Sequence, residues 1–213
     1  MHVLLADDHP MTIEGYCDAL RNEPFSTFHP IFTKVYNFED AYHAVDKNPF
    51  ELAIIDNSMP GYAEASILSG MDLALFIRQK LPNCKVIIIT AHTEVIIVYD
   101  LAKKARPDGL IIKNDVTPEK LQFAVMEVLK GNTYQSPLVK NCISEIWKKE
   151  LMVEDYNRQI LFYLSKGFKI KDLEQTIYLT SSAIQKRISR MKKAFDVSDD
   201  TSLVKEAIRQ GFI

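Results

Sequence analysis

The chain of 213 residues has a net charge of −2, with 47% hydrophobic and 25% charged residues, which is ordinary for a globular protein of one or two domains. No apolar run approaches the roughly 18 residues of a membrane span, and the N-terminus shows no signal-peptide pattern, so we expect a cytoplasmic protein without membrane contact. Cys17, Cys84 and Cys142 are far apart and odd in number, which favours buried free thiols over disulfides or a zinc site.

The first 131 residues alternate short apolar runs with helical patterns, which is typical of a parallel sheet with helices on both faces. Runs that are apolar throughout indicate strands buried on both sides. The predicted strands lie at 2–6, 31–36, 51–55, 85–90 and 109–112. The predicted helices lie at 11–22, 38–47, 70–80, 94–104 and 117–130. The last of them has Thr117 as its N-cap and Pro118 at its first position.

Residues 132–152 are predicted to form a linker, in which an amphipathic stretch around Trp147 is expected to pack against one of the domains. From residue 153 no strand pattern remains, and the predicted helices lie at 155–166, 170–176, 181–194 and 201–210. Residues 1–140 hold 13 basic and 18 acidic side chains, a net −5, whereas residues 141–213 hold 13 basic and 10 acidic side chains, a net +3. This asymmetry indicates two domains with different partners, and a polyanion is one candidate for the second.

Polar side chains stand at the ends of four predicted strands. Asp7 and Asp8 follow the first strand, Asp56 follows the third, Thr90 ends the fourth and Lys113 follows the fifth. Because ligands bind at the carboxyl ends of parallel strands, these side chains should converge. The three carboxylates suit Mg²⁺, and Asp56 suits attack on a phosphoryl group. Lys113 is expected to pair with Asp56 or a phosphoryl oxygen, and Thr90 is expected to donate a hydrogen bond to another phosphoryl oxygen.

Residues 1–131 resemble the receiver domain of bacterial two-component response regulators. The matching motifs are Ala6-Asp7-Asp8-His9-Pro10, Ile55-Asp56 followed by Met59-Pro60-Gly61, Ile89-Thr90-Ala91 and Ile112-Lys113. The resemblance implies a flavodoxin-like α/β fold with strand order 2-1-3-4-5, Asp56 as the phosphoacceptor and a sensor histidine kinase as the phosphoryl donor. It also implies that the backbone carbonyl of Ser58 completes the Mg²⁺ shell made by Asp7, Asp8 and Asp56.

Two features depart from the receiver pattern. Leu110 stands three positions before the lysine, where receivers usually carry an aromatic switch residue. Residues 62–69 form an insertion, which is either a functional loop beside the site or a surface excursion. His92 lies two residues after Thr90, at a position that flanks the phosphoryl group in receivers. We hypothesise that His92 and Ser58 modulate the lifetime of the phosphoryl group.

The C-terminal part predicts two helices joined by a tight turn, with Thr180-Ser181-Ser182 as the N-cap signal of the second. The basic and amide side chains of the second helix suit insertion into a DNA major groove, although from charge alone a solvated basic face is an equal alternative. Residues 153–213 resemble the LuxR-type helix-turn-helix of NarL/FixJ-type regulators. The matching residues are Gly167, Leu173, Ile177, Leu179-Thr180, Ile184, Val197 and the ending 207–213.

Position in that family suggests which side chains meet DNA. Gln185 and Arg187 are expected to face the bases, and the expected contacts with phosphates or the groove edge are Lys186, Arg190 and Lys193. Residues 183–187 replace the usual Thr-Val-Lys-x-His, and Asn157 replaces a usual glutamate, so the preferred DNA sequence does not carry over. The resemblance also implies a homodimer contact in the last helix, at Ser202, Leu203, Lys205 and Ala207.

The combined prediction is a response regulator, and not an enzyme in the ordinary sense, in which phosphorylation of Asp56 controls DNA binding and transcription. One alternative is a phosphorylation-independent DNA-binding regulator, which Leu110 and the 62–69 insertion favour. Another is a receiver with a protein-interaction output, and salt-dependent DNA binding would separate it from the others. A phosphatase of a related α/β class would need an acid two residues after the nucleophile, where Ser58 stands.

Overall fold

A parallel sheet forms the N-terminal part of the computed structural model. The structure describes residues 1–22, 28–209 and 211–213, and for 146–149 and 152–153 it describes the backbone alone. Among the described residues, six strands pair in the order β2-β1-β3-β4-β5-β6. The strands are β1 (His2–Ala6), β2 (Ile31–Val35), β3 (Leu52–Asp56), β4 (Lys85–Thr90), β5 (Gly109–Ile112) and β6 (Tyr134–Gln135). The predicted flavodoxin-like order 2-1-3-4-5 is confirmed, and the short β6 extends it beside β5.

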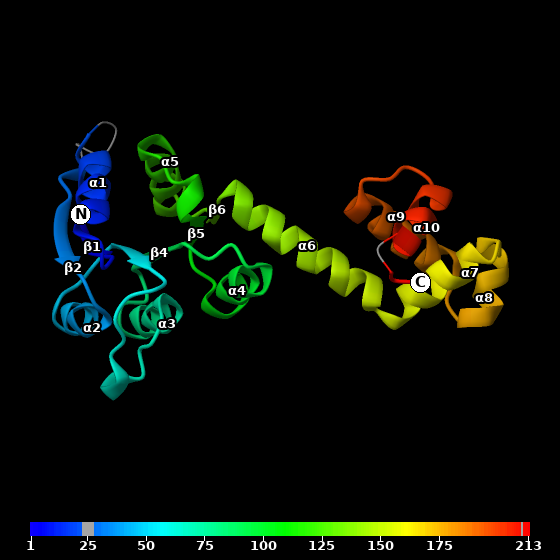
Figure 1. Ribbon diagram of the computed structural model, residues 1–213, viewed down its shortest axis with the longest axis horizontal. Helices are drawn as coiled ribbons and strands as arrows, with labels where there is room; N and C mark the ends of the chain where they lie inside the picture. The colour runs from blue at the N-terminus through cyan, green and yellow to red at the C-terminus, as the bar shows by residue number, and fades with distance from the viewer. Residues whose placement is uncertain (23–27, 210) are drawn as a thin grey trace. The chain divides into compact units, whose positions relative to one another are not determined.

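Helices cover both faces of this sheet, with α1 and α5 on one side and α2, α3 and α4 on the other (Figure 1). Their bounds are α1 (Pro10–Arg21), α2 (Phe38–Lys47), α3 (Gly70–Lys80), α4 (Val95–Asp100) and α5 (Pro118–Leu129). A π-helical turn, η3 (Leu101–Ala105), continues α4, so the helix predicted at 94–104 changes its winding midway. Every residue of β3 is buried, which explains why its sequence is apolar up to Asp56.

The helix starts follow the local capping signals. The side chain of Thr117 accepts a hydrogen bond from the Lys120 backbone N–H, and Pro118 occupies the first turn of α5, as predicted. Ser69 caps α3 in the same way through the backbone N–H of Asp72. These caps place the helix N-termini at the edge of the sheet where the strands end.

The 62–69 insertion is a folded excursion. It contains the short 3₁₀ turn η2 (Ala63–Ala65) and an antiparallel bridge between Tyr62 and Ile67, and the Ile67 side chain is buried. The ring of Tyr62 lies 5.5 Å from that of Tyr42 on α2, which stacks on Phe76 of α3 at 4.6 Å. The insertion therefore packs over α2 and α3 and leads directly into the cap of α3.

The chain divides into two units, Met1–Cys142 and Ile143–Ile213, and the division falls inside the helix α6 (Pro137–Val153). The segment predicted as a linker is therefore largely helical. Its start is held in the first unit, where Asp115 Oδ2 accepts the Leu138 N–H at 2.9 Å. Its end reaches the core of the second unit, where Leu151 is buried. The expectation for Trp147 concerns a side chain outside the described residues.

The second unit is helical, and its helices follow the predicted ranges closely. They are α7 (Asp155–Ser165), α8 (Ile170–Ile177), α9 (Ser181–Phe195) and α10 (Asp200–Arg209). Leu161, Leu173, Ile188, Met191 and Leu203 meet in its core. Tyr178 adopts a left-handed conformation at the end of α8, and Thr180 caps α9 through the Ala183 N–H, so the two helices are joined by a tight turn.

Candidate functional site

The ammonium of Lys113 joins two buried carboxylates at the ends of three strands. Its Nζ lies 2.9 Å from Asp56 Oδ2 and 3.1 Å from Asp7 Oδ2. Asp7 is 1% exposed and Asp56 is 4% exposed. The parallel register brings the ends of β1, β3 and β5 to one edge, and this is why Asp56 and Lys113 meet although they are 57 residues apart in sequence. The predicted convergence of these polar side chains is thus what the geometry shows for Asp7, Asp56 and Lys113.

Two carboxylate oxygens at this edge have no hydrogen-bond donor. Asp56 Oδ1 and Asp7 Oδ2 are buried and make no hydrogen bond, although Asp7 Oδ2 is within ion-pair distance of Lys113. Asp7 Oδ1 instead accepts the backbone N–H of His9 at 2.9 Å. Buried acceptors normally have partners, and lone oxygens of this kind fit a hard cation such as Mg²⁺.

The acidic pair that follows β1 is close enough to share a metal ion. Ligand atoms of Asp7, Asp8 and His9 lie within 4.8 Å of one another, and His9 Nδ1 is 2.7 Å from Asp8 Oδ1. Asp56 is outside this cluster and is connected to it through Lys113. The donor set offers carboxylate oxygens beside one imidazole, and its exposed members, Asp8 and His9, leave room for water ligands.

Burial dominates the electrostatics of the phosphoacceptor candidate. It raises the pKa of Asp56 above the usual aspartate value, while the hydrogen bond and charge of Lys113 oppose that shift. The pKa of Lys113 is also raised, because Asp56 and Asp7 together outweigh the desolvation that lowers it. Burial and the charges of Asp7 and Asp56 raise the pKa of the Tyr16 phenol on α1, which keeps that neighbour neutral.

Thr90 and its neighbours form the next part of this edge. Thr90 is fully buried at the end of β4, and its hydroxyl accepts the backbone N–H of His92 at 3.1 Å. His92 Nε2 lies 3.5 Å from the hydroxyl of Ser58, and His92 Nδ1 lies 3.2 Å from the Glu94 carboxylate. The structure thus brings Ser58 and His92 together, as the hypothesis about phosphoryl lifetime requires.

The loop after Asp56 is held by a close backbone approach from α3. A Cβ atom on Gly70 would stand 2.7 Å from the Asn57 Cα and from the Asp56 carbonyl oxygen. The Gly70 N–H donates to the Asn57 carbonyl at 3.0 Å. Only glycine allows this contact, so the start of α3 fixes the backbone that follows the phosphoacceptor candidate.

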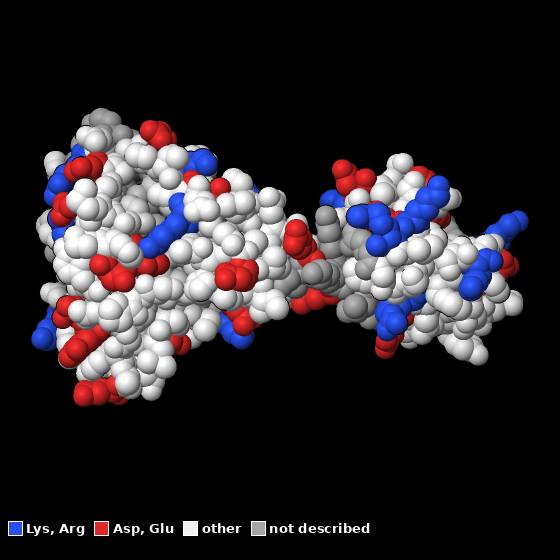
Figure 2. Space-filling view, viewed as in Figure 1, with Lys and Arg blue, Asp and Glu red and all other residues white. Residues whose placement is uncertain are grey.

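The predicted DNA-facing side chains on α9 do not share one environment. Gln185, Lys186, Arg190 and Lys193 are exposed. Arg187 is only 26% exposed, and its guanidinium lies 2.6 Å from Glu154 and 3.1 Å from the buried Asn157 Oδ1. The Arg187 guanidinium also lies over the ring of Tyr156. Arg187 therefore ties α9 to α7, and its proposed contact with bases stays a prediction. Basic side chains gather over α9 and α10 on the face shown in Figure 2.

The four residues predicted for the dimer contact divide into two pairs. Leu203 and Ala207 are fully buried in the core of the second unit. Ser202 and Lys205 lie on the accessible side of α10, and Ser202 bonds Asp199. In this structure the second pair is available to a partner, and the dimer contact itself stays a prediction.

Several polar residues at these sites were not singled out from sequence. Glu94 bonds His92, and Asp115 bonds the start of α6. Glu154 and Asn157 hold Arg187. A carboxylate two residues after a histidine is a local signal that could have identified Glu94. The other pairings join different elements, so the linear sequence carries no signal for them.

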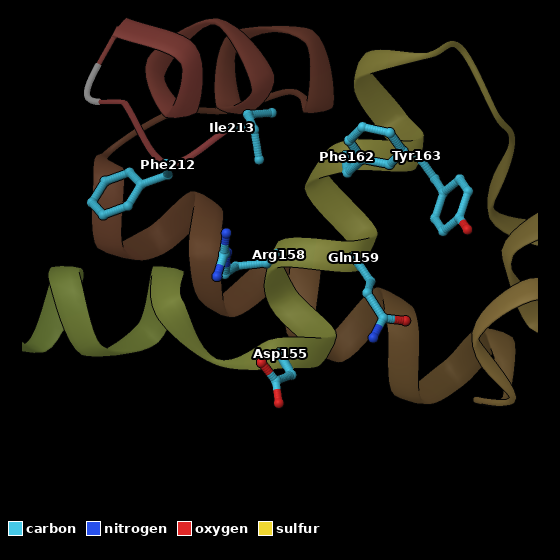
Figure 3. A pocket seen from close by; sticks show the side chains of 7 residues that line it. All are labelled: Asp155, Arg158, Gln159, Phe162, Tyr163, Phe212 and Ile213. Carbon is cyan, nitrogen blue, oxygen red and sulfur yellow. The ribbon is translucent and has the colours of Figure 1, made fainter.

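A separate hollow of about 360 Å³ lies in the second unit, between α7 and the last two residues (Figure 3). Its lining combines Asp155, Arg158 and Gln159 with apolar side chains, which are Phe162, Tyr163, Phe212 and Ile213. It shares no residue with the acidic edge of the sheet. Among the helices of the described residues, none is both long enough and apolar enough to cross a lipid bilayer.

Comparison with known proteins agrees with this geometry. The family model of the response regulator receiver domain matches residues 3–126. The probable transcriptional regulatory protein NarL of Mycobacterium tuberculosis is 26% identical over 215 residues, which cover 99% of this chain and 94% of that protein. The response regulator UvrY of Escherichia coli is 22% identical over 220 residues, covering 99% of this chain and 95% of that protein.

Solved structures share the fold over nearly the whole chain. RcsB of Salmonella typhimurium, a response regulator, matches with a TM-score of 0.61 at 19% identity and covers 97% of both chains. RcsB of Salmonella enterica serovar Typhimurium bound to a promoter in the presence of the phosphomimetic BeF₃⁻ matches with a TM-score of 0.60 at 19% identity and covers 96% of both chains. At these identities the likeness concerns the fold.

Proposed function

This chain belongs to the response regulator receiver family, and from that premise we propose that it is a NarL-type two-component regulator that controls transcription. The relatives it matches end to end include proteins named as transcriptional regulators, and the RcsB structures it resembles include promoter-bound ones. A sensor histidine kinase supplies the phosphoryl group, Asp56 accepts it, and the LuxR-type unit binds double-stranded DNA as a homodimer. Its place of action is the cytoplasm, where kinase and DNA meet.

The observation that carries the proposal is the Lys113 ammonium bridging Asp7 and Asp56, while the buried Asp56 Oδ1 has no hydrogen-bond partner. Asp56 Oδ1 is the oxygen that attacks phosphorus, while the bond between phosphorus and the donor breaks. Lys113 and Thr90 hold two phosphoryl oxygens. Asp7, Asp8, Asp56 and the Ser58 carbonyl are the groups that would hold Mg²⁺, and the ion would offset the repulsion between the carboxylates and the incoming phosphoryl group.

Phosphorylation then biases the receiver between two states and so changes DNA binding by the second unit. Gln185, Lys186, Arg190 and Lys193 are the accessible side chains of α9 that suit contact with DNA, and their exposure supports that role. The chain acts as a switch that the kinase drives, and its own chemistry is limited to accepting and slowly losing the phosphoryl group.

Acetyl phosphate with Mg²⁺ tests this function on the full chain. We expect one phosphoryl adduct by intact mass, its loss when EDTA replaces Mg²⁺, and its loss in Asp56→Asn. Hydroxylamine should also remove the adduct, because it cleaves an acyl phosphate and leaves phosphoesters intact. An adduct that persists in Asp56→Asn would contradict the assignment of the phosphoacceptor.

One alternative has a specific observation behind it. Leu110 is 1% exposed and fills the place where receivers carry the aromatic switch residue. A chain that binds DNA equally well with and without acetyl phosphate, and forms no adduct, would be a phosphorylation-independent regulator. A chain that binds no DNA at low salt would point to a protein-interaction output instead.

A further inference from the structure

A carboxylate, an imidazole and a hydroxyl form a chain beside the phosphoacceptor. Glu94 Oε2 lies 3.2 Å from His92 Nδ1, and His92 Nε2 lies 3.5 Å from Ser58 Oγ. Ser58 is two residues after Asp56, and the backbone N–H of His92 donates to the Thr90 hydroxyl at 3.1 Å. The imidazole is thus held between the two strand ends, β3 and β4, that carry the phosphoacceptor and its threonine.

Glu94 is itself anchored, so it can orient the ring. Its carboxylate accepts the Thr93 N–H at 3.1 Å, and its carbonyl accepts the Val98 N–H at the start of α4. Hydrogen bonds from its own backbone N–H, and then from His92, lower the pKa of Glu94, which keeps it a carboxylate. A carboxylate only accepts hydrogen bonds, so the hydrogen of the neutral ring sits on Nδ1 and the lone pair of Nε2 faces Ser58.

We propose that Glu94 is a positioning residue that holds His92 with its Nε2 lone pair toward the phosphoryl site, and that it thereby shortens the lifetime of the acyl phosphate on Asp56. The inference rests on the proposed function and deepens it. In the hydrolysis, a water oxygen bonds to phosphorus and the bond from phosphorus to the Asp56 oxygen breaks. Its electron pair returns to the carboxylate, and both water hydrogens leave with the phosphate. The Ser58 hydroxyl is 3.5 Å from His92 Nε2, at the limit of a hydrogen bond, so during hydrolysis that lone pair accepts from the water instead and directs its oxygen.

Carboxylates elsewhere play the same part: a carboxylate that accepts Nδ1–H fixes the tautomer and the orientation of a catalytic imidazole. The alternative is that Glu94 and His92 form an ordinary surface ion pair, since their side chains are 63% and 37% exposed. Exposed pairs of this kind contribute little to stability. A change in phosphoryl lifetime in a Glu94 variant therefore reports on the site and not on folding.

The test follows decay of the phosphorylated full chain after removal of acetyl phosphate, with Mg²⁺ kept constant. Glu94→Ala is expected to lengthen the half-life about three- to tenfold, the worth of one lost hydrogen bond. Glu94→Gln keeps an acceptor oxygen for Nδ1–H and is expected to stay within about twofold of the wild type. Asp100→Ala is the matched control, because it removes a carboxylate paired with Lys104 at the other end of α4.

A double-mutant cycle decides whether Glu94 acts through the ring. In a His92→Ala background, Glu94→Ala should add no further change. Nitrogen NMR of the unphosphorylated chain gives an independent readout: the hydrogen on His92 should be on Nδ1 in the wild type and should move toward Nε2 in Glu94→Ala.

Each contrary result has a separate meaning. An unchanged half-life in Glu94→Ala, or an equal effect with and without His92, overturns the inference and leaves the function intact. A wild-type ring protonated on Nε2 also overturns it. A wild-type chain that forms no acyl phosphate at all overturns the proposed function, and this inference with it.

Discussion

Asp56 and Arg187 are polar side chains whose surroundings affect stability as well as the roles proposed for them. Asp56 is 4% exposed, and burial raises the pKa of its carboxyl. A carboxyl with a raised pKa binds its proton more tightly in the folded chain than in the unfolded chain. The contribution of Asp56 to stability is therefore greatest below the ordinary aspartate pKa and falls as the pH rises from that value through the raised one. At neutral pH the ionised Asp56 carboxylate therefore lowers stability.

Asp56→Asn is accordingly expected to raise the free energy of unfolding at neutral pH in metal-free buffer, because a neutral amide avoids the cost of burying a charge. The gain should vanish at about pH 3, where the aspartate is protonated in both states. Urea unfolding at the two pH values measures it, with the exposed Asp46→Asn as the control. A less stable variant at neutral pH would mean that pairing with Lys113 outweighs burial.

Arg187 was predicted to face DNA bases, and the structure gives it a second role as a contact between α9 and α7. Its guanidinium bonds Glu154 and the buried Asn157 Oδ1, so Arg187→Ala leaves a buried acceptor without that donor. We expect a loss of about 1–3 kcal/mol in the unfolding free energy of the second unit. Lys186→Ala, at the exposed neighbouring position, is expected to stay within about 0.5 kcal/mol. Equal small losses in denaturant unfolding would show that Arg187 is not an anchor and is available to DNA.

At the scale of elements, the start of α3 lies very close to the backbone that follows β3. An added Cβ on Gly70 would meet backbone atoms of Asn57 and Asp56 at 2.7 Å, whereas one on Gly15 in α1 would meet nothing within 4 Å. Backbone cannot move aside as a side chain can, so the two glycines should respond oppositely to alanine.

Gly70→Ala is expected to cost about 1–3 kcal/mol through this overlap and to slow phosphorylation, because the displaced backbone belongs to Asp56 and Asn57, at the proposed phosphoacceptor. Gly15→Ala is expected to gain about 1 kcal/mol, since alanine favours a helix interior over glycine. Thermal unfolding and adduct formation with acetyl phosphate measure the two effects. A harmless Gly70→Ala would show that α3 does not fix this loop.

The first turn of α6 is held by Asp115, a residue close in sequence to Lys113 of the candidate site. Asp115, two residues after Lys113, accepts the Leu138 N–H in the first turn of α6. Asp115→Ala is expected to destabilise that turn by about 1 kcal/mol, whereas Asp115→Asn keeps an acceptor oxygen. Hydrogen exchange of the amides at the start of α6 should be faster in the first variant and near the wild type in the second. Equal exchange in all three would mean that the turn is held by other contacts.

At the scale of the whole molecule, the charge is divided unevenly between the part proposed to be phosphorylated and the part proposed to bind DNA. The acidic first part holds the proposed phosphoacceptor Asp56, and the basic second part, with a net +3 over residues 141–213, holds the exposed lysines of α9. DNA binding through phosphates releases counterions, so affinity should fall with salt, and each phosphate contact contributes about one unit to the slope of log affinity against log salt.

Lys186→Ala should therefore reduce that slope by about one per bound subunit and weaken binding to all sequences alike. Lys120→Ala, on α5 of the first unit, removes an equal charge and should leave the slope unchanged. Fluorescence anisotropy with labelled duplex DNA across a salt series measures both variants. Equal slopes in the two variants would place the phosphate contacts elsewhere.

Apolar periodicity and cap residues alone located nearly all strands and helices, because each of those signals is local. Apolar runs mark strands buried on both faces, and Thr117, Pro118 and Thr180 mark helix starts. The order of Asp7, Asp56, Thr90 and Lys113 along the chain predicted that these side chains converge, and the structure brings Asp7, Asp56 and Lys113 together. Parallel strands end at one edge, so residues that follow them must converge.

Other features were decided by the tertiary structure. The pairing of β6 with β5, the helical linker and the Arg187–Glu154–Asn157 contact depend on which elements meet. A basic residue at an exposed helical position looks the same in sequence whether it faces DNA or an acidic neighbour. Periodicity tells which side of an element is buried, but the polar partners across elements, 30 or 33 residues apart in the case of Arg187, are set by packing.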